Sequence, residues 1–124
     1  MTSKEIDKVF ALTPTERYSY FIKKVADFEE IWSLQKLEYA TISNTEGKSL
    51  TLVWAKREYA EKVKELCFPD FSSKSMELDD FLNAEYSMES LEQMKYAVMY
   101  NGDDYREVDW NTLKKDIEEE LENY

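Results

Sequence analysis

An amphipathic helix is the clearest element in the pattern of apolar and polar positions along the chain. Thr13, Pro14 and Glu16 have the spacing of a capping box with proline at the first helical position. Apolar side chains then recur at intervals of three and four residues, which places them on one stripe: Tyr18, Phe21, Ile22, Val25 and Ala26. The pattern predicts a helix that begins at residue 14 and buries one face, preceded by a short helix over residues 3–11.

Strand-like segments follow this helix, because short β-branched and aromatic runs replace the helical period. They cover residues 31–35, 39–43 and 50–54. The loop between the last two ends in Gly47, which accepts the positive φ of a hairpin turn. We expect three antiparallel strands, with Leu50, Leu52 and Trp54 on one buried face.

The second half of the chain predicts more helices and a second hairpin. A charged helix is expected over residues 56–66, a short strand over 76–78, and short helical segments that begin at Asp79–Asp80 and at Ser87. Strands 96–100 and 105–108 flank Asn101–Gly102, a dipeptide typical of a type I′ turn. Asp109 is suited to be the N-cap of a last helix running toward residue 124.

These elements predict an α+β fold. No repeat, low-complexity tract or linker divides the chain, so we expect one domain over residues 1–124. Its sheet should be antiparallel or mixed, with about five strands, and covered by helices. A chain of 124 residues with 43% hydrophobic and 35% charged residues is long enough to bury such a core without disulfides or metal.

The composition excludes several classes of chemistry. The chain has no histidine, which removes Ser-His and Cys-His hydrolases and imidazole metal sites. Cys67 is the only cysteine, so neither an intrachain disulfide nor a thiolate zinc cluster can form. With 2 glycines there is no phosphate-binding glycine loop. No secretory signal or membrane-spanning run is recognisable, and we expect a cytoplasmic protein with no bound metal or cofactor.

The net charge of −11 at pH 7 lies almost entirely in the second half of the chain. Residues 1–64 contain 11 basic and 10 acidic residues, whereas residues 65–124 contain 5 and 17. Such an excess of acid disfavours binding to nucleic acid or to anionic membranes. It is compatible either with a solvated surface or with a face that binds a basic protein.

Four residues are candidates for contacting a partner. Tyr20 and Lys24 are four residues apart and share one face of the predicted helix, where Arg17 could complete an anion-binding patch. The alternative is that Arg17 and Lys24 pair with local carboxylates while Tyr20 packs at the edge. Trp110 lies in the first turn of the last helix, where a partly exposed indole is expected to be a good contact residue.

Several segments resemble the signature of a bacterial family catalogued as domain of unknown function 2750. They are RYSYFIKKVAD (residues 17–27), EIW (30–32), LVW (52–54), YA (59–60) and LDDFL (78–82). The resemblance extends over nearly the whole chain. It implies a small α+β domain of bacterial origin and carries over no catalytic residue.

The favoured hypothesis for function is a non-catalytic protein-interaction module, for example an immunity or antitoxin protein whose acidic surface attracts a basic partner. The alternative is a small-ligand-binding protein or an enzyme that uses Arg17, Tyr20 and carboxylates around a pocket at the sheet edge. The adjacent pairs Asp79–Asp80 and Asp103–Asp104 fit a helix start and a loop better than paired catalytic acids. A third and weaker option is nucleic-acid mimicry. The sequence leaves the oligomeric state open.

Overall fold

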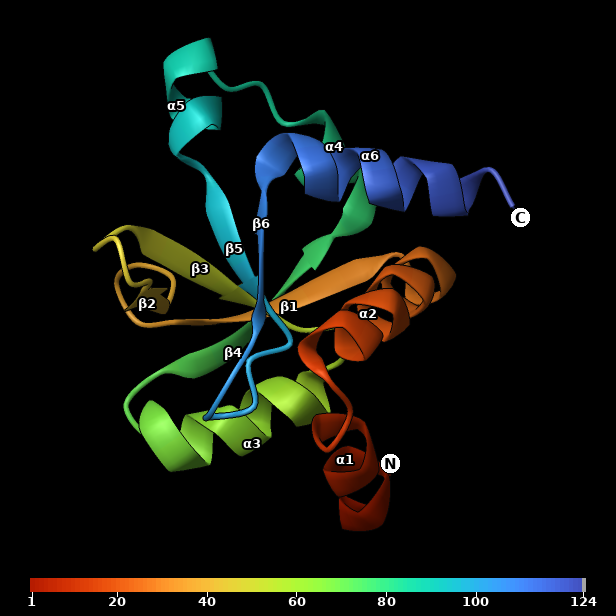
Figure 1. Cartoon of the computed structure of the whole chain (residues 1–124), viewed down its shortest axis with the longest axis vertical. Coiled ribbons are helices and arrows are strands. Elements are labelled where there is room, and N and C mark those ends of the chain that lie inside the picture. Colours follow the sequence, from red (N-terminus) through yellow and green to blue (C-terminus); the bar gives the residue numbers. More distant parts are fainter. Residues whose placement is uncertain (124) are drawn as a thin grey trace.

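A computed structural model describes residues 1–123, in which helices and strands form the predicted α+β arrangement (Figure 1). The helices are α1 (Ser3–Phe10), α2 (Pro14–Phe28), α3 (Arg57–Cys67), α4 (Leu78–Asn83), α5 (Met88–Gln93) and α6 (Trp110–Leu121). The strands are β1 (Glu30–Gln35), β2 (Thr41–Ser43), β3 (Ser49–Val53), β4 (Ser72–Glu77), β5 (Lys95–Val98) and β6 (Arg106–Asp109).

Helix α2 begins at the predicted capping box. The Thr13 hydroxyl accepts from the Glu16 N–H at 3.2 Å, and the Glu16 carboxylate accepts from the Thr13 N–H at 3.0 Å. The predicted apolar stripe, including Phe21 and Val25, is buried. The helix ends at Glu29, whose left-handed backbone (φ 56°) turns the chain directly into β1.

The strands form two sheets, with orders β1-β4 and β2-β3-β5-β6, instead of the expected single sheet. The expectation of three antiparallel strands holds for β2 and β3, whereas β1 pairs along six residues with β4 and forms isolated antiparallel bridges from Trp32 to Trp54 and from Gln35 to Tyr39. β3 pairs antiparallel with β2 and parallel with β5. Trp32 of β1 and Trp54, directly after β3, exchange N–H···O bonds of 2.9 and 2.8 Å, and the Ser33 hydroxyl donates to the Leu52 carbonyl of β3 at 2.6 Å.

The two predicted turns have different outcomes. Gly47 adopts positive φ (77°) in the β2–β3 hairpin, as expected. The prediction of a type I′ turn at Asn101–Gly102 is wrong. Such a turn needs positive φ at both residues, but in this loop positive φ occurs at Gly102 and at Met99 (φ 54°) and not at Asn101. The Asn101 side chain instead accepts from the N–H groups of Asp103 and Asp104, each at 2.9 Å, and so organises a longer loop.

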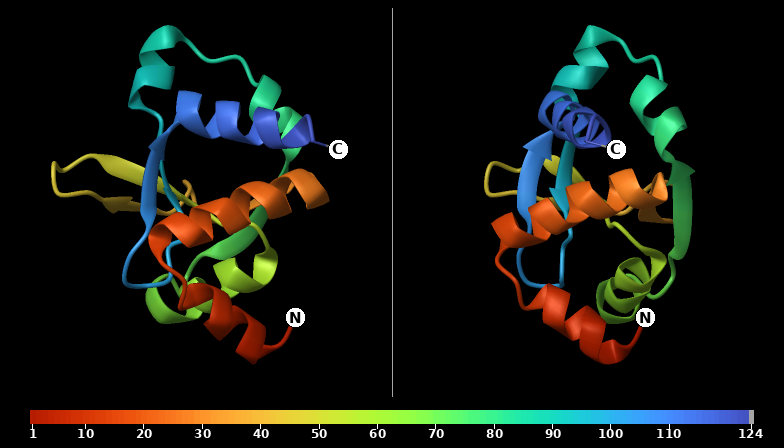
Figure 2. Two further views of the ribbon diagram at one scale, coloured as in Figure 1. Left: turned by 45° about the vertical axis from the view of Figure 1, so that its right-hand side comes forward. Right: turned by 90° about the vertical axis from the view of Figure 1, so that its right-hand side faces the viewer.

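The core lies between these sheets and the longer helices. α2 and α6 lie side by side against β5 and β6, whereas α3 packs on β1 and β4 and α1 lies near α3 (Figure 2). Trp54 is fully buried, and its indole N–H donates to the Tyr100 carbonyl at 2.8 Å. Among the described residues, no helix combines the length and apolar character needed to cross a bilayer.

Candidate functional site

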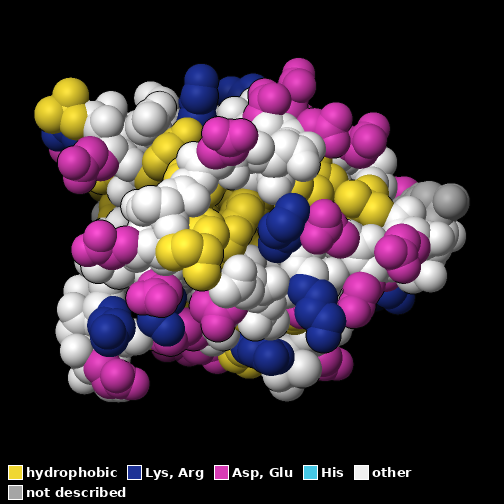
Figure 3. Space-filling view, turned by 90° about the horizontal axis from the view of Figure 1, so that it is seen from above, with side chains coloured by type: hydrophobic (Ala, Val, Ile, Leu, Met, Phe, Trp, Pro, Cys, Tyr) yellow, Lys and Arg dark blue, Asp and Glu magenta, His cyan; other side chains and the backbone are white. Residues whose placement is uncertain are grey.

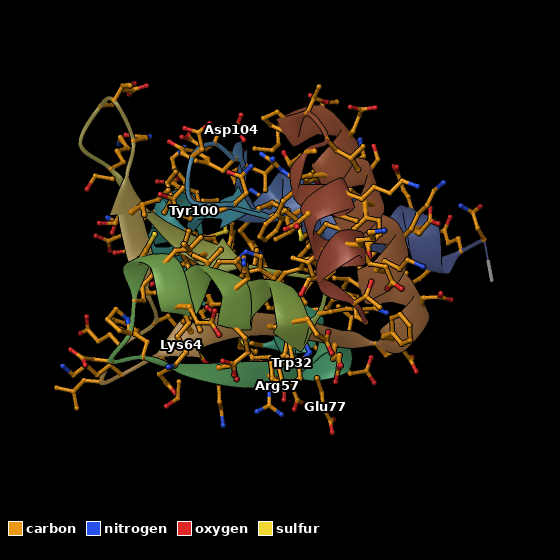
Figure 4. All side chains as sticks on the ribbon, turned by 90° about the horizontal axis from the view of Figure 1, so that it is seen from below. Trp32, Arg57, Lys64, Glu77, Tyr100 and Asp104 are labelled. Carbon is orange, nitrogen blue, oxygen red and sulfur yellow. The ribbon has the colours of Figure 1, made fainter. Side chains whose placement is uncertain are left out.

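Arg17 is buried inside the protein and does not lie at the surface patch expected from the sequence. Its side chain is 1% exposed, and its Nη1 donates to the carbonyls of Phe10 and Leu12 at 3.0 and 3.1 Å. Its Nη2 forms an ion pair with the carboxylate of Asp104, which is labelled in Figure 4. The chain doubles back between α1 and α2, so this guanidinium joins the end of α1 to the β5–β6 loop.

Tyr20 and Lys24 lie on one face of α2, as their spacing predicts. The Lys24 ammonium is 5.8 Å from the centroid of the Tyr20 ring. The Tyr20 hydroxyl shares a hydrogen bond of 2.7 Å with the hydroxyl of Tyr59 on α3. Burial of Tyr59, together with this bond, raises the pKa of its hydroxyl well above the ordinary value. Arg17 makes its contacts elsewhere, so the three residues do not form one anion-binding patch.

Trp110 is also buried, with 4% of its surface exposed. Its indole packs against Phe81 at 5.0 Å and against Tyr86 at 5.8 Å between ring centroids. The expectation of a partly exposed indole is wrong, because α4 and the segment after it fold over the first turn of α6. Tyr86 remains 46% exposed, so it carries the aromatic surface that the sequence assigned to Trp110.

Acidic side chains concentrate at the end of the molecule built from α4, α5, α6 and the segments that connect α4 to β5 (Figure 3). Lys114 and Lys115 are the only basic residues among residues 78–94 and 110–122, and they pair with Glu118 and Glu119. We call the exposed carboxylates of this end the acidic face: Asp79, Asp80, Glu85, Glu89, Glu92, Glu118, Glu119 and Glu122.

Two large apolar side chains are exposed beside these carboxylates. Tyr86 is 46% exposed and Met88 is 75% exposed, within a continuous run of exposed residues from 83 to 90. Helix α5 has no buried residue. Sequence reasoning missed both residues. The available signal was two large apolar side chains within an otherwise small and polar segment, NAEYSMES.

The carboxylate pairs considered for catalysis are far apart. Asp79 and Asp80 lie in the first turn of α4, whereas Asp103 and Asp104 lie in the β5–β6 loop at the opposite end of the molecule (Figure 1). A surface hollow of about 350 Å³ lies between the end of α2 and β4, and neither Arg17 nor Tyr20 lines it. Across residues 1–123, no group of three or more acidic or cysteine side chains is arranged to hold a metal ion.

Comparison with known proteins gives one match. Residues 18–121 match the model of a protein family described as "Protein of unknown function (DUF2750)". No curated protein and no solved structure matches the chain significantly.

Proposed function

From the premise that the chain belongs to the DUF2750 family of proteins of unknown function, we propose that it is a non-catalytic interaction module whose acidic face binds a basic protein. The observation that carries the proposal is the exposure of Tyr86 and Met88 beside eight exposed carboxylates. An apolar contact with a charged surround is the arrangement found in specific protein interfaces.

The two parts of this surface have different roles in binding. The carboxylates accelerate encounter with a basic partner, because long-range attraction raises the association rate and weakens as salt increases. Tyr86 and Met88 supply apolar contact after encounter and lengthen the lifetime of the complex. Trp110 acts indirectly by packing beneath Tyr86. An immunity or antitoxin protein that covers a basic target is one concrete form of this function.

A pair of matched charge reversals tests the location of the binding surface. Glu89 and Glu92 are exposed on α5 and are replaced by lysine in the first variant. Glu58 and Glu65 are exposed on α3 and are replaced in the control. Both variants change the net charge by the same amount. Proteins captured from the native lysate by the wild-type chain are purified, and their association rates with all three chains are measured at low and physiological salt.

We expect the α5 variant to associate about tenfold more slowly than the control at low salt. The difference should shrink as salt is raised. In addition, a Tyr86→Ala, Met88→Ser variant should dissociate faster while its association rate stays close to that of the wild type. Equal slowing by both charge variants would show that only net charge matters and would contradict the proposal. A partner unaffected by the α5 variant, or a small molecule as the sole bound species, would also contradict it.

A further inference from the structure

Strand β4 has one free edge. In an antiparallel pair, residues opposite each other direct their backbone groups either both toward or both away from one another. Ser75 lies opposite Trp32, whose N–H and C=O are bonded to Trp54 on the other side of β1. Ser73 lies opposite Leu34, whose carbonyl accepts from Ala40. The backbone groups of Ser73 and Ser75, and by the same alternation those of Glu77, therefore point away from β1.

Among residues 1–123, no other strand pairs with this edge. β4 lies at the periphery of the molecule in Figure 2 and in Figure 4, where Glu77 is labelled. The strand pairs with β1 over six residues in an unbroken register, without a bulge or proline. Four of its residues are exposed: Ser72, Lys74, Ser75 and Glu77. A regular strand edge of this kind is a template for pairing with another strand.

The charge around β4 is compatible with a second copy of the same chain. Residues 56–77, which form α3, β4 and their connection, contain five basic and five acidic residues. This segment therefore carries no net charge, in contrast to the acidic face. Two copies that approach through β4 therefore meet less repulsion than two acidic faces would, although each chain carries a net charge of −11.

We propose that two copies of this chain pair edge to edge through β4, antiparallel about a two-fold axis at Ser75. This register places Ser75 opposite Ser75 of the other copy, Ser73 opposite Glu77, and Lys74 opposite Met76. No like charges are directly opposed. The outward N–H and C=O groups of three residues on each copy then form about six backbone hydrogen bonds.

The pairing also separates the two acidic faces. α4 begins at Leu78, directly after β4, so the acidic face lies beyond one end of the strand. An antiparallel partner places its own α4 beyond the other end. The dimer thus presents the two faces at opposite poles, although the dimer does not depend on what those faces bind.

Two variants at Ser75 and one measurement on the wild type test the proposal. Ser75→Pro removes an outward N–H without removing a bond to β1, whereas Ser75→Ala keeps that N–H. Mass in solution is measured by sedimentation from about 1 to 100 μM for the wild type and both variants. Circular dichroism checks that each variant is folded. Amide hydrogen exchange of Ser73, Ser75 and Glu77 in the wild type, at both ends of the concentration range, requires no substitution.

We expect the wild type and Ser75→Ala to reach twice the chain mass of 14.8 kDa, and Ser75→Pro to remain at the chain mass. The amides of Ser73, Ser75 and Glu77 should exchange more slowly at the higher concentration. A wild-type chain that is monomeric throughout the range would overturn the proposal. So would a dimer that survives in folded Ser75→Pro, or one in which these amides stay unprotected. If Ser75→Pro fails to fold, the exchange measurement decides.

Discussion

Replacement of Arg17 by alanine removes the group that joins the end of α1 to the β5–β6 loop. The guanidinium makes two hydrogen bonds to the carbonyls of Phe10 and Leu12, and a bond from a charged donor contributes about 1.5–3 kcal/mol to stability. The ion pair with Asp104 adds little, because the Asp104 side chain is 52% exposed. We therefore expect the free energy of unfolding to fall by about 3–6 kcal/mol, the sum of these two carbonyl bonds.

Urea unfolding followed by circular dichroism measures this loss, since a single domain of this size normally unfolds in one transition. Two controls locate its origin. Asp104→Asn leaves both carbonyl bonds in place and should cost less than about 1 kcal/mol, because the Asp104 carboxylate is half exposed. Lys24→Ala removes a half-exposed ammonium that lies over the Tyr20 ring and should cost less than about 1 kcal/mol.

The result that would refute this reasoning is an Arg17→Ala protein within about 1 kcal/mol of the wild type. Such a result would mean that the Arg17 guanidinium does not stabilise the fold through its buried contacts. Arg17 would then again be a candidate for contacting a partner at the surface. A loss as large for Asp104→Asn as for Arg17→Ala would instead place most of the energy in the ion pair.

Three further predictions follow from other buried or capped groups. Thr13→Ala should lower the free energy of unfolding in urea by about 1 kcal/mol, because it removes the N-cap of α2; an unchanged value would contradict the capping role. Trp54→Phe should lower it by about 2–4 kcal/mol, because it leaves the Tyr100 carbonyl without its donor and creates a cavity; a loss below about 1 kcal/mol would contradict this. Burial raises the pKa of Tyr18, Tyr59 and Tyr96 above the ordinary value, so their stabilising contribution is complete below about pH 10 and is lost as pH rises further. Measurements of tyrosinate absorbance and of denaturation as a function of pH test this prediction. Ionisation of all three tyrosines near pH 10 in the folded protein would contradict it.

The sequence predicted those parts of the fold that depend on nearby residues. The capping box of α2 joins Thr13 and Glu16, which are three residues apart, and the Gly47 turn needs one backbone conformation. The apolar stripe of α2 is set by helical geometry alone. Each of these features can be recognised without knowing where the rest of the chain lies.

The errors concern contacts between distant parts of the chain. β1 and β4 pair although residues 36–71 separate them, and short apolar segments do not encode their partners. The burial of Arg17 depends on Asp104, and the burial of Trp110 depends on Phe81 and Tyr86. Helical spacing gave the correct neighbours Tyr20 and Lys24, but it could not show which other element covers each side chain.

The parallel pairing of β3 with β5 determines when this protein can fold during its synthesis. Leu52 and Val53 of β3 find their partners at Ala97 and Val98, after α3, β4, α4 and α5 have been made. Until those residues leave the ribosome, one edge of an apolar strand stays open, and α2 lacks the C-terminal helix against which it packs. That edge therefore stays open in the nascent chain until β5 has been synthesised, and α2 gains its helical partner only when α6 follows.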